Sequence, residues 1–419
     1  MFQRSSVAAC LLLGGAASPA QDWPWWRGPH HDGVWNSPAS FPESFPGEGL
    51  PTVWRQAIGG GYSGITISEG RVFTLDRPEG REEERVLCFS LETGAPLWEH
   101  RYSADYGDLD YGSGPRASVT LSEGRAYALG ATGQLHCLEA SSGRLLWSVD
   151  TPKELGARQP TWGFAASPLV WRDLLILHLG AEPDGCYVAL DRLSGAPRWR
   201  SGSDAAGYST PVPVQHRGRD LLLCWTPLHL CGLDPRDGRV LWRIPYEVQY
   251  GVSIADPVLH GDIVFIAGYW HGSRAVRLGE DPAEATLLWS REDLCGLMAQ
   301  PLFREPYLYL LERSRGLSCV ELETGRTLWE DESHLLTPGG RNPQASLVAI
   351  GDSGRALALN SNGELVLLEL RPEGYAELSR AQLIGKTWAH PAFSDTMIVA
   401  RSDREILCAR FSLQPTQAR

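Results

Sequence analysis

Residues 137–147 read CLEASSGRLLW, and variants of this stretch recur along the whole chain. In each copy a small or thiol residue is followed by a hydrophobic residue, an acid, a Gly and, four residues after that Gly, a Trp. Clear copies end at Trp98, Trp147, Trp199, Trp242 and Trp329, a weaker copy ends at Trp289, and a degenerate copy over 368–378 has Leu378 at the Trp position. Such a repeat constrains the fold class more strongly than any single residue does.

Each copy alternates hydrophobic and polar residues, turns at the Gly and resumes with a β-favouring aromatic residue. That order is typical of a strand, a tight turn and a second strand. The repeat recurs every ~40–50 residues, which suits a four-stranded propeller blade better than a helical repeat. The chain is therefore predicted to be all-β.

A second repeated feature gives the number of blades. Ahead of each copy stands a Ser or Ala, followed by one further residue that is polar in most copies and often by Pro; these starts are at Ser63, Ala117, Ala166, Ser209, Ala255, Ala299, Ala345 and Ala389. Innermost propeller strands converge on an axis, where close packing leaves room only for small side chains. The eight starts predict an eight-bladed β-propeller of four-stranded antiparallel blades.

The final blade has only three strands of its own, expected near 388–393, 397–401 and 406–411. Residues 52–55 can supply the missing outer strand, because Trp54 stands one period before Trp98. Pairing an N-terminal strand with the C-terminal blade also removes an exposed sheet edge. We therefore expect the N-terminal strand to close the ring.

The remaining segments give the domain boundaries. Residues 1–20 have the basic start, apolar core and small-residue end of a signal peptide, so a periplasmic or secreted protein is expected. Residues 21–50 are rich in Trp and Pro and are expected to pack on the propeller, burying Trp23, Trp25, Trp26 and Trp35. The propeller is assigned to 51–412 and a C-terminal tail to 413–419.

Composition narrows the possible partners. The chain has 419 residues, 43% of them hydrophobic and 21% charged, and a formal net charge of −12. This acidity disfavours nucleic acid. Outside the signal peptide no segment reaches the ~18–20 apolar residues of a membrane span. We expect a monomer that binds a protein or a small-molecule ligand.

Nine cysteines occur, one of them in the signal peptide, and the chain contains no C-x-x-C motif. Thioredoxin-like, zinc-ribbon and covalent haem sites are therefore not expected. Most cysteines fall at similar strand positions in different blades, too far apart for bonding. Cys224 and Cys231 flank an expected hairpin and are the one pair suspected of forming a disulfide.

The candidate site is formed by eight residues, one from each start. Each of them stands two positions before the polar position of its start. They are Tyr62, Arg116, Ala165, Tyr208, Ile254, Met298, Gln344 and Trp388. The polar positions themselves include Asp256, Gln300 and His390, and nearby stand Trp162, Tyr250, Arg341 and Asn342. All are expected around one mouth of the axial channel. The alternative interpretation is that these side chains bond across blades and line a water-filled channel.

These motifs resemble the pyrroloquinoline-quinone-like (PQQ-like) β-propeller repeat proteins of the quinoprotein alcohol dehydrogenase-like superfamily. The resemblance rests on the eight starts, the Gly-x-x-x-Trp endings and the signal peptide, and covers essentially the whole mature chain. The stretches WPWWRGPHHDG at 23–33, YGSGPRA at 111–117 and WGFAASP at 162–168 are similar to secreted members from planctomycete-like bacteria. That family includes PQQ- and calcium-dependent dehydrogenases and non-catalytic propellers such as the outer-membrane assembly lipoprotein.

A dehydrogenase of that family would need particular side chains. Asp256 is the candidate base for the alcohol proton, and Arg116 or Arg341 could polarise the quinone oxygen. The candidate catalytic residues are thus Asp256 and Arg116, the candidate calcium ligands are Asp105, Asp108 and Asp110, with no metal site assigned, and the candidate cofactor-binding residues are Trp162, Tyr208, Gln300, Arg341, Asn342, Trp388 and His390.

Two departures weaken this enzyme hypothesis: the chain has no adjacent Cys-Cys pair, which such dehydrogenases usually carry, and its blades are compact. The favoured function is therefore a non-catalytic ligand- or protein-binding scaffold in the cell envelope. The alternative is a periplasmic PQQ- and calcium-dependent dehydrogenase that oxidises an alcohol or a sugar.

Overall fold

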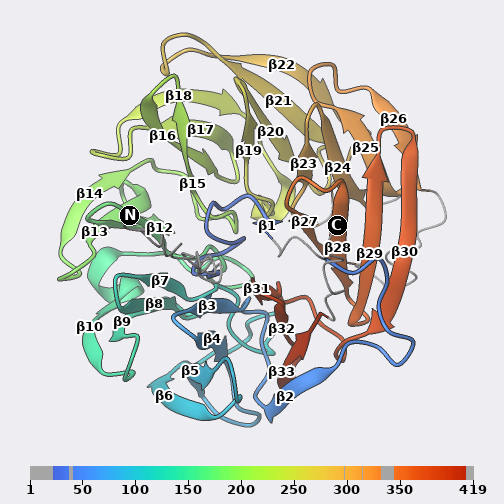
Figure 1. The fold of residues 1–419 in the computed structure, drawn as a ribbon. Coiled ribbons are helices and arrows are strands. Elements are labelled where there is room, and N and C mark those ends of the chain that lie inside the picture. The colour runs from blue at the N-terminus through green and yellow to red at the C-terminus, as the bar shows by residue number, and fades with distance from the viewer. Residues whose placement is uncertain (1–21, 37–40, 297, 314, 332–343, 412–419) are drawn as a thin grey trace, which may run out of the picture.

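The computed structural model describes residues 22–36, 41–296, 298–313, 315–331 and 344–411. The predicted signal peptide and the C-terminal tail lie outside these residues. Eight sheets stand around a common centre, and each is one blade (Figure 1). The eight-bladed all-β propeller predicted from the repeats is confirmed.

The strands follow the chain blade by blade, each sheet beginning at its innermost strand. Blade 1 contains β3 (Thr66–Ser68), β4 (Arg71–Asp76), β5 (Glu83–Ser90) and β6 (Pro96–Ser103), and blade 2 contains β7 (Thr120–Ser122), β8 (Arg125–Leu129), β9 (Gln134–Glu139) and β10 (Leu145–Asp150). Blade 3 contains β11 (Leu169–Trp171), β12 (Leu174–Ala181), β13 (Gly185–Asp191) and β14 (Pro197–Ser201), and blade 4 contains β15 (Val212–His216), β16 (Arg219–Trp225), β17 (His229–Leu233) and β18 (Val240–Pro245).

The second half of the ring repeats this order. Blade 5 contains β19 (Val258–His260), β20 (Ile263–Ala267), β21 (Ser273–Leu278) and β22 (Ala285–Arg291), and blade 6 contains β23 (Leu302–Arg304), β24 (Tyr307–Glu312), β25 (Gly316–Glu321) and β26 (Thr327–Glu330). Blade 7 contains β27 (Ala345–Ile350), β28 (Arg355–Asn360), β29 (Glu364–Arg371) and β30 (Gly374–Gln382), and blade 8 contains β31 (Ala392–Ser394), β32 (Met397–Arg401), β33 (Glu405–Arg410) and the N-terminal β2 (Thr52–Ala57).

The repeated Trp and Gly hold neighbouring blades together. The ring of Trp98 at the edge of blade 1 lies over Gly143 in the last turn of blade 2, and its Nε1 donates to the carbonyl of Ala140 at 3.0 Å. A Cβ on Gly143 would stand 2.5 Å from the Trp98 ring. The same indole-to-carbonyl bond joins Trp54 to Leu91, Trp199 to Pro235, Trp289 to Leu322 and Trp329 to Arg371.

Trp242 is an exception, and the sequence of the next blade gives the reason. The corresponding turn of blade 5 runs GEDPAE over 279–284, without the Gly on which the indoles of Trp54, Trp98, Trp147, Trp199 and Trp289 lie. Trp242 instead turns onto its own blade, where a Cβ on Gly232 would stand 2.2 Å from its Nε1. The Trp is buried all the same.

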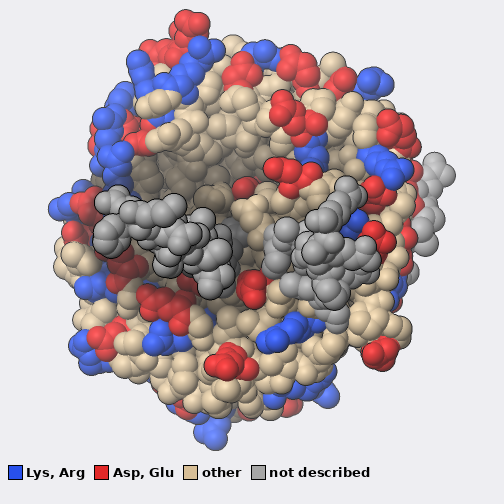
Figure 2. All heavy atoms as spheres, viewed as in Figure 1, with Lys and Arg blue, Asp and Glu red and all other residues tan. Residues whose placement is uncertain are grey.

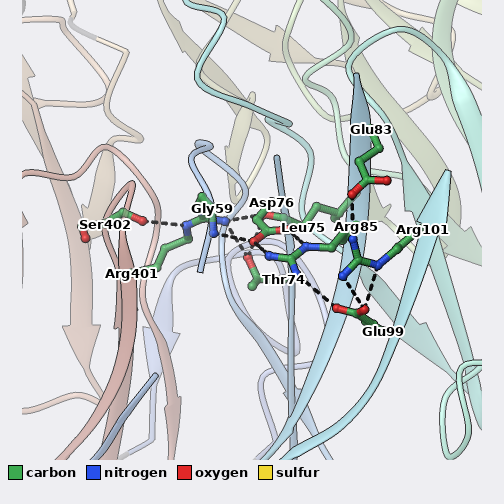
Figure 3. Close-up of polar contacts among 10 residues, drawn as sticks. All are labelled: Gly59, Thr74, Leu75, Asp76, Glu83, Arg85, Glu99, Arg101, Arg401 and Ser402. Atoms are coloured by element: carbon green, nitrogen blue, oxygen red, sulfur yellow. Dashed lines mark hydrogen bonds and ion pairs between the residues drawn. The ribbon is translucent and has the colours of Figure 1, made fainter. Parts of the chain in front are cut away.

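The ring closes between the two ends of the chain, as expected. Strand β2 pairs antiparallel with β33, with Trp54 opposite Cys408, and β2 and β33 lie side by side in Figure 1. A buried arginine reinforces the seam between blades 8 and 1 (Figure 3): Arg401 of β32 donates to the carbonyls of Leu75 and Gly59, the second at 2.8 Å. Close by, Arg85 donates to the buried carboxylate of Asp76 at 2.6 and 2.9 Å.

The first part of the Trp- and Pro-rich segment, residues 22–36 and here called the leader, runs through the centre of the ring. Its β1 (Val34–Trp35) pairs parallel with β27, the innermost strand of blade 7, and β1 lies near the centre of Figure 1. The side chains of Trp23 and Trp35 are fully buried, whereas Trp25 and Trp26 are partly buried. The strand β1 was not predicted, because two residues within a loop-like sequence carry no periodicity.

Two further features complete the fold. Cys224 and Cys231 are opposite each other on β16 and β17, but both are free buried thiols, so the suspected disulfide is not formed. The described residues form only two short helical turns, η1 (Thr151–Leu155) and η2 (Gln249–Gly251). Within the described part of the chain, no helix is long and apolar enough to span a membrane.

Candidate functional site

A cavity of about 490 Å³ lies at one end of the axial channel. It is lined by all eight residues that stand two positions before the polar position of each start: Tyr62, Arg116, Ala165, Tyr208, Ile254, Met298, Gln344 and Trp388. These positions converge because every blade begins with its innermost strand and all eight strands enter the channel from the same side. A volume of this size is typical of small-molecule sites.

Aromatic rings form most of the cavity wall. The rings of Tyr62 and Tyr111 lie 5.8 and 5.7 Å from that of Trp388, measured between centroids. On another part of the wall Trp162 lies 5.6 Å from Tyr208. Such rings offer flat apolar surface at low cost in conformational entropy.

A third aromatic group comes from blade 5 and the loop before it. The rings of Tyr269 and Trp270 meet edge to face at 4.5 Å. Tyr250, in η2, adds its ring at 5.5 Å from Trp270 and is 65% exposed. The aromatic surface therefore continues from the cavity onto its rim.

Arg116 brings a positive charge to the cavity from blade 2. Its guanidinium donates to the carbonyls of Gly114, Asp110 and Tyr111, the last two at 2.9 and 2.8 Å. These neutral acceptors fix the side chain without cancelling its charge. Burial lowers its pKa, yet the group stays protonated because an arginine pKa begins so high.

Arg313 brings a second positive charge from the end of β24 in blade 6. Its guanidinium carbon lies 5.1 Å from the ring centroid of Tyr269 and 5.9 Å from that of Trp270. Among the described residues, neither Arg313 nor Arg116 forms an ion pair with a carboxylate. Blades 2 and 6 are four places apart in a ring of eight, so the two arginines come from opposite walls.

Asp256, the predicted base, is not part of the cavity lining and is only 2% exposed. Its Oδ2 accepts a 2.6 Å hydrogen bond from Nε1 of Trp26, and its Oδ1 accepts one of 2.8 Å from the backbone N–H of Thr210. Burial raises its pKa to about 6, against the opposing charge of Arg27. The expectation that Asp256 stands at the mouth is therefore wrong: the leader engages its carboxylate.

Gln300 also lies in the wall behind the cavity, where its Oε1 accepts a 2.7 Å hydrogen bond from the backbone N–H of Asp256. His390 does line the cavity, and its ring lies 4.5 Å from that of Trp26. Burial lowers the pKa of His390 to about 3, so its ring is neutral at neutral pH. His390 thus separates the cavity from the leader.

The leader crosses the channel on the far side of His390 from the cavity. Trp23 forms backbone hydrogen bonds with Ile67 of blade 1, the backbone N–H of Leu121 in blade 2 donates to Pro24, and Arg27 donates to the carbonyl of Pro301 in blade 6. These contacts fall at or after the polar positions of the innermost strands, whereas the cavity residues precede them. The cavity therefore opens on one side of the ring, and the leader crosses the channel on the other.

The predicted site residues thus divide into three groups. Arg116, Trp162, Tyr208, Trp388 and His390 line one cavity, Asp256 and Gln300 lie behind it, and Arg341 and Asn342 fall outside the described residues. Sequence reasoning missed five lining residues: Tyr111, Val252, Tyr269, Trp270 and Arg313. They occupy loops outside the repeat, and the only available signal was the aromatic pair at 269–270.

The described residues do not fit calcium-bound PQQ. The aromatic wall and the arginines could accept a flat anionic ring, but no Asp or Glu among the described residues lines the cavity. Nowhere in the described chain do three or more His, Cys, Asp or Glu side chains gather as metal ligands, and Asp105, Asp108 and Asp110 are exposed. Hard oxygen ligands for Ca²⁺ are thus lacking there.

The comparisons with known proteins agree with this fold. The family model described as outer membrane protein assembly factor BamB matches residues 82–331. Two proteins of that description are similar: one from Moranella endobia, 25% identical over 72% of this chain and 77% of its own, and one from Alkalilimnicola ehrlichii, 29% identical over 48% of this chain and 49% of its own.

Among solved structures, BamB from Moraxella catarrhalis has a TM-score of 0.60 at 18% identity and covers 88% of this chain and 99% of its own. A europium-containing methanol dehydrogenase has a TM-score of 0.66 at 11% identity and covers 91% and 90%. The protein is thus a PQQ-like β-propeller with the quinoprotein alcohol dehydrogenase-like fold. Within that class the chain belongs to the family described as outer membrane protein assembly factor BamB.

Proposed function

We propose that this protein is a non-catalytic binding scaffold of the cell envelope, which holds a ligand or a segment of another protein in the cavity. One observation carries the proposal: the described cavity wall combines flat aromatic rings with two unpaired arginines, while the candidate base Asp256 is bonded to the leader. Recognition of a ligand needs only the aromatic rings and the arginines. Alcohol oxidation would need the carboxylate of Asp256 to be free to accept a proton.

The predicted signal peptide and the relatives support a place in the envelope. Residues 1–20 have the features of a signal peptide, and both relatives are described as outer membrane protein assembly factors. We therefore place the protein in the periplasm or outside the cell, as a monomer that acts through contacts with a partner. The dehydrogenases of the same fold are similar at only 11% identity, which supports the fold alone.

The test is a titration of the purified protein with PQQ, with and without Ca²⁺, followed by tryptophan fluorescence and by dye-linked oxidation of alcohols and sugars. Trp162 and Trp388 line the cavity, so a ligand there should quench emission. We expect no calcium-dependent binding and no turnover. Saturable calcium-dependent binding accompanied by turnover would replace the scaffold with the dehydrogenase. A Trp388→Phe variant shows whether any quenching arises in the cavity.

A further inference from the structure

The cavity has the opposite charge to the molecule around it. The whole chain carries a formal charge of −12, and acidic and basic side chains are interspersed around the rim of the face shown in Figure 2. Among the described lining residues, by contrast, Arg116 and Arg313 are cations, none is an acid, and His390 is neutral. A partly enclosed site strengthens such charges because water screens them less. The cavity is therefore suited to an anionic group.

The two cations repeat one arrangement on opposite walls. Arg116 lies over the ring of Tyr62, at 5.6 Å from its centroid, and Arg313 lies over Tyr269 at 5.1 Å. Each guanidinium therefore stands beside an aromatic platform, with the width of the channel between the two pairs. A ligand that meets both pairs needs two acidic groups with an apolar group between them.

The site extends beyond the cavity. Tyr111 and Tyr250 are 41% and 65% exposed at its edge, and Tyr250 adopts a left-handed backbone conformation with φ of 57°. Exposed aromatic residues beside arginine are characteristic of protein-binding surfaces. The leader crosses the channel behind Trp26 and His390, so an occupant enters and leaves on the same side. A loop or a chain end of a partner protein can contact this aromatic edge and can also enter and leave on one side.

We propose that the cavity binds an acidic segment of a partner protein, inserted as a loop or chain end, in which two carboxylates flank an aromatic or aliphatic side chain. The carboxylates would pair with Arg116 and Arg313, and the side chain between them would pack on Tyr62, Trp388 and Trp270. This inference rests on the proposed scaffold function and names the chemistry of its partner.

The probe is the acetylated and amidated heptapeptide Gly-Asp-Gly-Phe-Gly-Asp-Gly, titrated into the full mature protein by calorimetry. Matched peptides replace both Asp by Asn, or Phe by Ala. We expect the loss of the Phe ring to weaken binding about tenfold, the loss typical of one well-placed interface anchor, and the loss of both carboxylates to weaken it by more than about tenfold. Affinity for the Asp peptide should also fall between about 20 and about 300 mM salt, because charge pairing is screened.

Arg313→Gln is the decisive variant, since this side chain is exposed and its substitution is expected to leave the blade intact. We expect it to weaken the Asp peptide about fivefold to tenfold and to leave the Asn peptide unchanged. Arg144→Gln, on an outer turn with 63% of its side chain exposed, is the matched control and should change neither. Arg313→Glu should in turn bind a peptide with one Asp replaced by Lys better than the parent peptide.

Several results would overturn the inference. Equal binding of the Asp and Asn peptides, no binding of either, or an Arg313→Gln variant with full affinity would exclude an acidic partner. Tighter binding of benzene-1,4-dicarboxylate than of the peptide would assign the site to a small free dianion. These failures leave the scaffold function standing, whereas calcium-dependent PQQ turnover removes the scaffold function itself.

Discussion

At the scale of the residue, Asp256 shows how the leader and the ring depend on each other. Its carboxylate accepts hydrogen bonds from Trp26 of the leader and from Thr210 of blade 4, and Arg27 lies near enough to favour its charge. Burial nevertheless raises its pKa from the ordinary value of 3.8 to about 6. The folded state therefore keeps the Asp256 proton to a higher pH than the unfolded chain does.

This pKa predicts how Asp256 affects stability. Because the pKa of Asp256 is higher in the folded state than in the unfolded one, Asp256 stabilises the fold fully below pH 3.8. This contribution to stability is lost as the pH rises through about 6. Between pH 3.8 and about 6 the unfolding free energy of the wild type should fall by about 3 kcal/mol relative to that of Asp256→Asn, whose side chain cannot titrate. The measurement is urea denaturation of both proteins across this range. Parallel pH curves would show that the carboxylate does not titrate in this way.

At the scale of the element, the contact between Trp and Gly explains why the repeat takes its form. The Trp of one blade needs a flat backbone on the next, and Gly143 provides it at φ +72° without a side chain. A β-carbon there would meet the Trp98 ring at 2.5 Å. The two residues of the motif therefore act in neighbouring blades.

Gly143→Ala tests this contact, and Gly124→Ala is its matched control. Both glycines have φ +72°, but nothing lies within 4 Å of a Cβ at Gly124. The control should cost about 1 kcal/mol for the left-handed backbone alone. Gly143→Ala should cost a further 1–3 kcal/mol (roughly), because the Trp98 ring must move. Equal unfolding free energies would mean that the blades do not depend on this packing.

The seam between blades 8 and 1 gives a second prediction at this scale. Arg401 is fully buried and donates to Gly59, Thr74 and Leu75, as Figure 3 shows. Arg401→Met leaves these acceptors unsatisfied and should cost about 3 kcal/mol or more in chemical denaturation. Arg55→Met, which breaks an exposed pair with Glu405 at 2.6 Å, should cost no more than about 1 kcal/mol. Similar losses would contradict a special role for the buried network.

At the scale of the whole molecule, what could be predicted from sequence was what repeats from blade to blade. The starts and the Trp-Gly endings appear in blade after blade, so blade number, closure and the ring of cavity residues could be predicted. Features that occur once left no such trace. The bond between Trp26 and Asp256 joins residues 230 positions apart, and Arg313 lies in a loop outside the repeat. Only folding shows that the single acid among the polar positions anchors the leader.

The closed ring also predicts where a cross-link should have its largest effect. Ala57 of β2 and Glu405 of β33 are opposite each other, and joining them links the two ends of the propeller. A disulfide stabilises mainly by restricting the unfolded chain, and more so for a longer loop. Oxidised Ala57→Cys/Glu405→Cys should therefore exceed its own reduced form by about 3–5 kcal/mol in unfolding free energy.

The matched control is Ser68→Cys/Arg71→Cys, which joins opposite residues of one hairpin in blade 1. Its loop is short, so oxidation should raise its unfolding free energy by about 2 kcal/mol or less. Comparing each variant oxidised and reduced cancels the effect of the substitutions themselves. If both disulfides stabilise equally, closing the loop between β2 and β33 adds nothing, and the unfolded chain must already keep its ends together. If the cross-link between 57 and 405 has the larger effect, the pairing of β2 with β33 makes the eight sheets fold and unfold as one cooperative ring.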